Sequence, residues 1–483
     1  MELQLNKKNC SYLQTQVRQV QSQEQAQELR IPDEFPDIGR VLGAWGQSVI
    51  RSKEWRAEAM IVSGGVSASV LYLAEDGSGV KCVETWIPFQ TKWNFSQPHR
   101  EGTMRVQCLL KNLEARTMSA RKFMLRVGLD VLGEAFEQTD AEIFYPGDLP
   151  DEVELLTNVY PVVLPKEAGE KPFFVEEEIR VPDATKWIHF SLDPQISEQN
   201  VVGSRVVMRG SGTLRYSYID EQGAVRNGSK EISLSQFADL DGEYDKEATA
   251  DVILSLSSLE PEFTSEGVHL QCGLVSQYLI RDRMLLVLAE DAYSPSREVI
   301  ASQQLLCLPL ELDNRMETLE AQSLFQGGRV LNTTFWPQQP VAYREDDMIH
   351  IEVPGTFHFL YQDYEGNLQT AVENWTGEVT MPAADNCQML ATIRGVELAG
   401  SSCRIYLNLQ AVSNQQMPMI CELKVGDPKP LDEARPTLIL QRMEGDSLWE
   451  LAKATGSTMA AIRKANHLSQ DPAEGQMLLI PIL

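Results

Sequence analysis

Apolar and polar residues alternate along most of the chain, with the period of two that a β-strand shows when one of its faces is buried. The clearest stretch runs from Ile349 to Tyr361, where every second residue is apolar or glycine. The same pattern ends at Tyr72 and at Tyr218. Five residues after each tyrosine stands a glycine, as expected for a strand that runs into a turn. The three glycines are Gly77, Gly223 and Gly366.

A second landmark lies downstream of each tyrosine and consists of an apolar residue followed by glutamate. The glutamates are Glu114, Glu260 and Glu397, which follow the tyrosines by 42, 42 and 36 residues. Alternating apolar positions precede and follow each glutamate, which predicts a second hairpin in each copy. The returning strand of the first copy begins at an odd offset from its glutamate, and those of the other two copies begin at an even offset. We therefore expect a turn of altered length in the first copy.

These landmarks predict three copies of one structural unit. A Pro-Asp pair precedes the tyrosine by 36 residues in the first two copies, at positions 36–37 and 182–183, and nothing equivalent precedes the third tyrosine. Two copies are therefore close relatives, and the third is shortened and diverged. We expect a mainly β protein with three β-sandwich- or barrel-like copies, because strands with one apolar face must bury it against a second sheet.

The predicted domain limits follow from the landmarks and from clusters of glycine, proline and acidic residues between the copies. They are residues 31–160, 172–306 and 315–425 for the three copies and 437–483 for a C-terminal module. An N-terminal strand or helix segment takes residues 1–30, and a linker takes residues 426–436. Within the N-terminal segment, the spacing of Leu13, Val17 and Val20 predicts a helix over residues 13–29.

The C-terminal module changes from strand periodicity to a strand, two short helices and a closing strand. Asp446 or Ser447 can cap the first helix, whose apolar face continues to Ala452. Gly456 ends this helix at a position that favours a left-handed cap. A second helix follows, and the segment from Gly475 forms a turn and the last strand. The predicted order is βααβ.

This module resembles the LysM domain, a βααβ family that binds glycans containing N-acetylglucosamine. The resemblance rests on a G-D-[ST]-L-W-x-[IL]-A signature, a later asparagine and a closing G-[QE]-x-L-x-[IV]-P motif. The matching residues are Gly445, Asp446, Ser447, Leu448, Trp449, Leu451 and Ala452, then Asn466, and then Gly475, Gln476, Leu478, Ile480 and Pro481. Arg442 departs from the pattern, since the family usually has valine there, and this leaves the register of the first strand open.

The resemblance implies which residues contact a ligand. In the family, the turn before the first helix and the loop after the second helix line the binding groove. The corresponding residues are Gly445, Asp446, Ser447, Leu448, Asn466, His467 and Leu468. A structural interpretation also exists for the first three, because every such helix needs a cap. If the domain binds a protein instead, we expect the contact to spread onto the helix faces and to include Lys453, Arg463 or Lys464.

The three upstream copies resemble the SPOCS domains of spore coat assembly proteins in their Pro-Asp, Tyr-x4-Gly and hairpin landmarks. Three such copies followed by one LysM domain resemble the coat morphogenesis proteins of endospore-forming bacteria. The resemblance implies a non-catalytic scaffold that binds coat morphogenetic proteins at the forespore surface, in the mother cell cytoplasm and then in the coat. The alternative is a peptidoglycan-binding protein of the spore cortex or cell wall.

Charge and cysteine content narrow the function classes. The chain has 42 Lys plus Arg against 69 Asp plus Glu, and its formal net charge of −27 repels nucleic-acid phosphates, so we expect no nucleic-acid partner. No apolar run is long enough to cross a bilayer or to form a secretory signal, so we expect a cytoplasmic protein without membrane insertion. The eight cysteines are spread too widely for a zinc motif and are expected to be reduced.

Catalytic and metal motifs find little support in the sequence. The six histidines lack metalloprotease spacing, and no serine-nucleophile elbow occurs. The alternating acidic residues of segment 239–247 suggest a calcium loop, but its glycine stands fourth rather than sixth, so a solvated loop is the preferred interpretation. We expect no enzyme activity, no cofactor and no metal site. The three repeated glutamates are expected to stabilise their hairpins.

Overall fold

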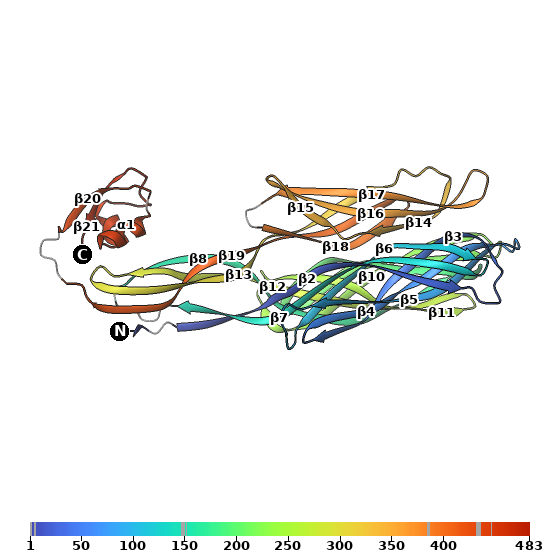
Figure 1. The fold of residues 1–483 in the computed structure, drawn as a ribbon, viewed down its shortest axis with the longest axis horizontal. Coiled ribbons are helices and arrows are strands. Elements are labelled where there is room, and N and C mark those ends of the chain that lie inside the picture. The colour runs from blue at the N-terminus through green and yellow to red at the C-terminus, as the bar shows by residue number, and fades with distance from the viewer. Residues whose placement is uncertain are drawn as a thin grey trace.

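The computed structural model describes residues 2–3, 6–145, 150, 152–383, 387–430, 436–445 and 447–483. These residues form twenty-one strands and two short helices, so the prediction of a mainly β protein is confirmed. The strands pair in antiparallel fashion. Figure 1 shows a long β body, a narrower extension and a small C-terminal module beyond it. No helix in the described ranges is long and apolar enough to cross a membrane.

The first copy is a sandwich of two three-stranded sheets, with the orders β2-β7-β6 and β3-β4-β5. Side chains from both sheets, such as Val66 and Leu125, share one buried core. The first strand of the copy thus pairs with its last. The strands are β2 (Asn6–Arg30), β3 (Ile38–Arg56), β4 (Ala59–Ala74), β5 (Val80–Asn94), β6 (Thr103–Ser119) and β7 (Lys122–Tyr145).

The second copy repeats this plan, with the sheets β11-β12-β8 and β10-β9. Strand β9 folds back on itself near Gly203, where φ is 60°. Its two halves are linked by side-chain hydrogen bonds from Thr185 to the backbone oxygen of Ile219 and from Ser197 to that of Arg209. The strands are β8 (Glu154–Arg180), β9 (Ala184–Asp220), β10 (Val225–Tyr244), β11 (Thr249–Thr264) and β12 (Gly267–Tyr293).

The third copy keeps the same order of pairing, although two short strands, β14 and β15, stand where the first copy has the single strand β3. Strand β19 pairs with β13 and β18, and β16 lies between β17 on one side and β14 and β15 on the other. A two-residue strand, β1 (Glu2–Leu3), also pairs with β19. The strands are β13 (Arg297–Gln322), β14 (Arg329–Pro337), β15 (Val341–Glu345), β16 (Met348–Gln362), β17 (Leu368–Pro382), β18 (Cys387–Ala399) and β19 (Ser402–Pro428).

The helix predicted over residues 13–29 is wrong, because this segment lies within strand β2. A register shift between Thr15 and Val17 marks a β-bulge in its pairing with β7. A spacing of four, as between Leu13 and Val17, fits a strand as well as a helix, and the bulge places these two side chains against different buried clusters. From Gln21 to Arg30 the burial alternates strictly, as in a strand at the edge of a sheet.

The predicted tyrosine–glycine hairpins are confirmed. Strands β4, β9 and β16 each run past the tyrosine into a turn before the next strand begins. Gly77, Gly223 and Gly366 have φ values of 76°, 75° and 88°, in the left-handed region that favours glycine. The alternating positions before the third tyrosine are also buried, as the period of two predicted.

The odd offset in the first copy has a different cause from the one predicted. Two residues close the second hairpin in all three copies, at positions 120–121, 265–266 and 400–401, so the expected turn of altered length is wrong. The pairing of β6 with β7 instead shifts between Thr117 and Ser119. The other two copies stay in register from the glutamate to the turn. An extra residue in a β-bulge therefore accounts for the odd offset of the returning strand in the first copy.

The paired ends of β2 and β7, β8 and β12, and β13 and β19 extend beyond the sandwiches, and we call this part the stalk (Figure 1). The three strand pairs turn apolar side chains toward one another and share a buried cluster. Its members are Cys10, Tyr12, Ile143, Phe144, Val162, Leu164, Leu286, Leu288, Leu306, Leu308, Met417 and Met419. The three copies are therefore not separate units, since they build one core together.

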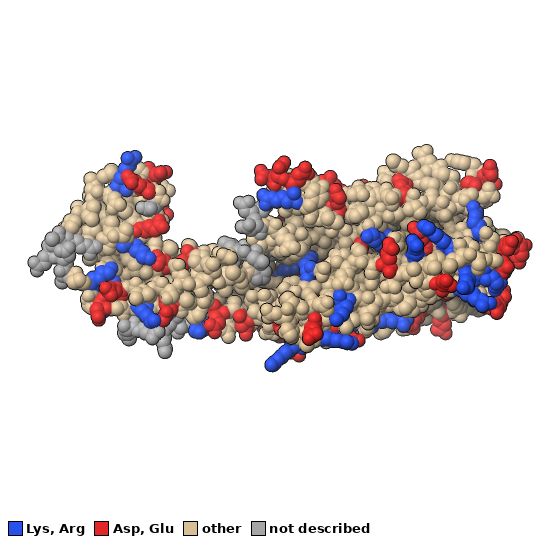
Figure 2. Space-filling view, viewed as in Figure 1, with Lys and Arg blue, Asp and Glu red and all other residues tan. Residues whose placement is uncertain are grey.

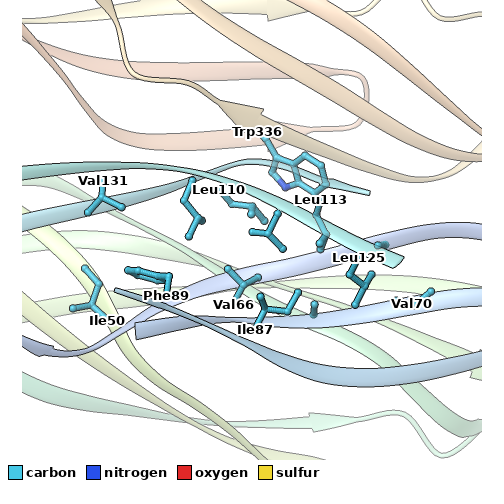
Figure 3. Packing of buried hydrophobic residues seen from close by; sticks show 14 of the residues in the cluster. Ile50, Val66, Val70, Ile87, Phe89, Leu110, Leu113, Leu125, Val131 and Trp336 are labelled. Atoms are coloured by element: carbon cyan, nitrogen blue, oxygen red, sulfur yellow. The ribbon is translucent and has the colours of Figure 1, made fainter. Parts of the chain in front are cut away.

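A second junction joins the third copy to the first. Trp336 of β14 is buried within the core of the first copy, where Figure 3 shows its indole ring above Leu110 and Leu113. His358 of β16 packs against the same ring, with 4.0 Å between ring centroids. Burial lowers the pKa of His358 to about 4, so the ring is neutral at pH 7.

Six charged side chains gather where strands of the three copies meet, and we call them the junction cluster; five are buried, and that of Arg18 is partly buried. They are Arg18, Arg105, Glu134, Asp251, Arg281 and Arg394. Arg105 of β6 pairs with Glu134 of the same copy at 2.6 Å and with Asp251 of the second copy at 3.0 Å. Asp251 also contacts Arg394 of the third copy. The cluster thus connects all three copies.

On the outer surface, acidic and basic side chains intermingle on the face shown in Figure 2.

Candidate functional site

The C-terminal module has the predicted βααβ order. Its elements are β20 (Leu438–Arg442), α1 (Leu448–Thr455), α2 (Met459–Ala465) and β21 (Met477–Pro481). The register of β20 is settled by its pairing with β21, in which Arg442 lies opposite Met477 and Leu440 lies opposite Leu479. Arg442 is exposed, so an arginine is tolerated at a position where the family usually has valine.

Local sequence determines where α1 begins and ends. The Ser447 hydroxyl accepts a hydrogen bond from the Glu450 backbone N–H at 3.2 Å, and the Glu450 carboxylate accepts one from the Ser447 N–H at 2.9 Å. This reciprocal arrangement is a capping box. Gly456 ends the helix with φ at 67°. Both limits agree with the sequence prediction.

A small core holds the module together. Its buried residues include Trp449, Leu451 and Ile462. Leu448, a predicted groove residue, is buried there as well, so its side chain supports the first loop from within. Leu468 of the second loop is half-buried and packs against the same core. The two predicted loops are therefore brought onto one core, at Leu448 and Leu468.

The first predicted groove loop precedes α1. Gly445 is exposed and has φ at 73°, so its backbone is accessible to a ligand. Ser447 is exposed, but its hydroxyl already serves the helix cap. Asp446, which was predicted between them, lies outside the described residues. Within the described part of this loop, the backbone of Gly445 is the group most open to a ligand.

The second predicted groove loop follows α2. The Asn466 side chain donates to the Leu479 backbone oxygen at 2.6 Å and accepts from the Leu479 N–H at 2.8 Å. Asn466 therefore fastens the loop to β21, which is a structural role. His467 is exposed with φ at 54°, an unusual conformation for a residue with a side chain. Its imidazole is available to a ligand.

A contact that the sequence did not predict fixes the domain to the stalk. Asp291, near the end of β12, accepts a hydrogen bond from the Trp449 indole N–H at 2.8 Å and pairs with the Lys453 ammonium at 2.7 Å. Tyr293 donates to the Ser457 backbone oxygen at 2.9 Å, and its ring meets the Trp449 indole edge-on with 4.7 Å between centroids. In Figure 1, α1 lies on the side of the domain nearest the stalk.

We call these contacts between the LysM domain and the stalk the clamp, and they occupy one of the three predicted interface residues. Lys453 is engaged by Asp291 of the same chain. Arg463 is exposed and forms an ion pair with Asp471 within the domain at 2.7 Å. Lys464 is exposed on α2. Of the three, Arg463 and Lys464 are the ones that lie outside the contact with the stalk.

The acidic segment 239–247 begins as strand, because β10 runs to Tyr244, so the preferred interpretation as a solvated loop is wrong for this part. Glu167 of β8 accepts hydrogen bonds from the backbone N–H groups of Asp241 and Gly242 at 2.9 and 3.1 Å and from the Tyr244 hydroxyl at 3.0 Å. Asp239 forms an ion pair with Arg205 at 2.8 Å. In the parts of the chain that the structure describes, no group of three or more His, Cys, Asp or Glu residues could hold a metal ion.

Comparisons with known proteins identify one part of the chain. A search of curated proteins and a search of solved structures gave no match. The family model of the LysM domain matches residues 444–481. This range contains both helices, the closing strand and both predicted groove loops. The chain therefore carries a C-terminal LysM domain.

Proposed function

We propose that this protein is a non-catalytic scaffold that binds N-acetylglucosamine-containing glycan through its LysM domain. The LysM match at residues 444–481 carries the proposal. The position of the clamp supports it, because the hydrogen bonds and ion pair to the stalk come from Trp449, Lys453 and Ser457. None of these is a predicted groove residue.

The chemistry of the two loops suits an uncharged sugar. Backbone groups at Gly445 can hydrogen-bond an acetamido group or hydroxyls, and the His467 imidazole can do the same from the other loop. Leu468 adds a half-buried apolar surface. Asn466 and Ser447 hold the loops in place through the bonds described above.

The test is calorimetric titration of the full chain with an N-acetylglucosamine tetramer. We expect His467→Ala to weaken binding while circular dichroism stays unchanged, and Arg463→Gln, on the outer face of α2, to bind as the natural protein does. Trp449→Ala is a folding control, expected to cost about 3–5 kcal/mol because the indole is buried. Absence of binding by the natural protein would overturn the glycan proposal.

A second candidate is a role in endospore coat assembly, in which the scaffold binds coat morphogenetic proteins at the forespore surface in the mother cell cytoplasm. It rests on the SPOCS-like landmarks and is favoured by an exposed apolar row across β8 and β12 of the stalk, where Val159 pairs with Val287 and Pro161 with Leu285. Contiguous apolar surface of this kind is typical of protein contact sites.

Localisation of a fluorescent fusion during sporulation separates the two candidates. The charge-reversing changes Arg463→Glu and Lys464→Glu should abolish coat localisation if the LysM domain binds a coat protein. Lys453 is left unchanged, because reversing its charge would also break the clamp to Asp291. Localisation that survives these changes but is lost together with glycan binding in His467→Ala would support the glycan proposal alone. Cleavage of spore peptidoglycan by the purified protein would contradict a non-catalytic role.

A further inference from the structure

A cavity of about 210 Å³ lies where the three copies meet, and we call it the junction cavity. Its walls come from β3 and β6 of the first copy, β9, β10 and β11 of the second, and β14 and β18 of the third. The lining is mixed, with polar side chains beside aromatic ones. Examples are Gln47, His189, Asp193, Arg215, Trp336 and Arg394.

Arg394 is the unusual residue of this lining. Its side chain is only 6% exposed, and one of its terminal nitrogens contacts Asp251. Its Nε and Nη1 atoms are buried and have no hydrogen-bond acceptor among the described residues. A buried guanidinium with unmet N–H groups is costly, because these groups have left water without gaining an acceptor.

The charge of Arg394 is also incompletely balanced. Its carboxylate partner, Asp251, is shared with Arg105 and Arg281. Burial lowers the pKa of Arg394 and outweighs the opposing effect of Asp251. Burial works to raise the pKa of Asp251, but the surrounding guanidinium groups outweigh it and lower the pKa. Glu134 is the other carboxylate of the junction cluster, so four guanidinium groups share two carboxylates.

The other charges of the lining do not supply the missing anion. Asp193 is already paired with Arg215 across the two halves of β9. Burial lowers the pKa of His189 to about 4, so its ring is neutral at pH 7 and can still exchange hydrogen bonds. The lining as a whole therefore offers donors and one unsatisfied positive charge.

We propose that the junction cavity binds a small molecule that carries a carboxylate or a phosphate group, with Arg394 as its main contact. An oxyanion there accepts the free N–H groups of Arg394 in charge-assisted hydrogen bonds and balances its charge. The cavity is larger than the anionic group alone, and its polar and aromatic walls contact the remainder of the ligand. This site is separate from the LysM domain and independent of the function proposed for it.

The test uses the full chain, titrated calorimetrically with inorganic phosphate and with acetate at constant ionic strength. We expect one site per chain for one of the two probes, and which probe binds tells whether the ligand carries phosphate or carboxylate. Arg394→Gln should weaken binding at least about tenfold, which corresponds to about 1.4 kcal/mol. Arg394→Lys, which keeps the charge, should weaken it less.

Arg463→Gln is the matched control, since Arg463 is an exposed arginine of the LysM domain. It should bind the probes as the natural protein does. A second measurement uses the natural protein and so does not depend on whether a variant folds. Crystals soaked in selenate should show an anomalous peak within hydrogen-bond distance of the Arg394 guanidinium. Binding of neither probe, unchanged binding by Arg394→Gln, or selenate found only elsewhere would each overturn the site. Binding of the sugar tetramer is unaffected in every case.

Discussion

At the scale of single residues, the structure explains why some landmarks recur at fixed spacing. The Tyr72 hydroxyl donates a hydrogen bond to the Pro36 backbone oxygen at 2.9 Å, so the tyrosine and the Pro-Asp pair of the first copy meet in space. Their separation of 36 residues is therefore the length of chain needed to return to the same place. The sequence could show that this spacing repeats, but only the fold shows that it reflects a contact.

The order in which the cysteines react with an alkylating reagent tests which of them are buried. Cys307 is exposed, whereas burial raises the pKa of Cys82, Cys108, Cys272 and Cys403 to about 12. The thiolate is the reactive form, so alkylation at pH 8 should modify Cys307 well before these four. Peptide mass spectrometry after short exposure to iodoacetamide measures the order. Earlier modification of any of the four would contradict the packing described.

Substitution of two neighbouring residues in the second LysM loop should change the stability of the domain by different amounts. Asn466→Ala removes two hydrogen bonds to Leu479 and should destabilise the domain by about 1–3 kcal/mol. His467→Gly should change stability by less than about 1 kcal/mol, because glycine accepts the left-handed backbone readily. Thermal unfolding followed by circular dichroism compares the two. Equal losses would mean that His467 is also structural.

At the scale of elements, strand periodicity was predictable, and irregularities in strand pairing were not. Alternation identified three strands in each copy, the one that ends at the tyrosine and the two that flank the glutamate, because each has one buried face. The spacing of Leu13 and Val17 in β2 fits a helix and a strand equally, and the bulge at Thr117 imitated a change of turn length. A bulge adds a single residue and leaves no composition signal, so a single sequence gives no means to place it.

One bulge recurs in all three copies, three residues before the repeated glutamate. It falls at Lys111, Ser257 and Arg394. A bulged residue is left out of the regular ladder and can point in a new direction. In the third copy this position carries the arginine of the junction cavity, so a shared backbone feature has acquired a copy-specific side chain.

Removal of residues 1–30 tests the assignment of β2 as a strand. The deletion leaves one edge of β7 unpaired from Lys122 to Tyr145, while the other edge still pairs with β6. A bare edge pairs readily with other chains, so we expect oligomers or aggregates in light scattering coupled to size exclusion. Deletion of residues 437–483 is the control and should leave the body monodisperse. A soluble, compact product of the first deletion would contradict the role given to β2.

The clamp between the LysM domain and the stalk should be insensitive to pH in the neutral range. Burial works to raise the pKa of Asp291, but hydrogen bonds from Lys453 and Trp449 lower it below the ordinary value of 3.8. The ionised carboxylate therefore stabilises docking at every pH above about 4, and the contribution is lost as pH falls through the lowered pKa.

Asp291→Asn should accordingly weaken docking throughout the range from pH 5 to pH 8. Small-angle scattering measures the resulting increase in distance between the LysM domain and the β body. Asp471→Asn, which removes a carboxylate within the LysM domain, serves as the control and should stay docked. Undocking of the natural protein between pH 8 and pH 5 would show that another group holds the domain.

At the scale of the whole molecule, the sequence could not reveal how the copies are joined. Arg105, Asp251 and Arg394 are separated by well over a hundred residues and carry no motif, yet they meet in one buried cluster. Asp291 and Trp449 are equally remote in sequence. The two predicted groove loops of the LysM domain could be located in the sequence because a local signature marks them. Contacts between remote segments depend on the packing of whole sandwiches.

The junction cluster should make the β body unfold as one unit. Arg105→Met leaves Glu134 and Asp251 without a main partner and should cost about 3–5 kcal/mol. Arg116→Met, which breaks an exposed pair with Glu114, should cost less than about 1 kcal/mol. Calorimetry should show a single transition for the body that moves down in the first variant only. Separate transitions for the three copies would contradict a shared core.

The pairing of first strand with last in each copy affects how the protein is made. Asn6 pairs with Tyr145, Glu154 with Tyr293 and Arg297 with Pro428, so each opening strand emerges from the ribosome long before its partner. Until then its edge is bare, and contacts this remote in sequence form slowly. Synthesis is therefore the stage at which this chain is most exposed to aggregation. We expect its yield to depend on chaperones and on the rate of translation more than on the stability of the finished fold.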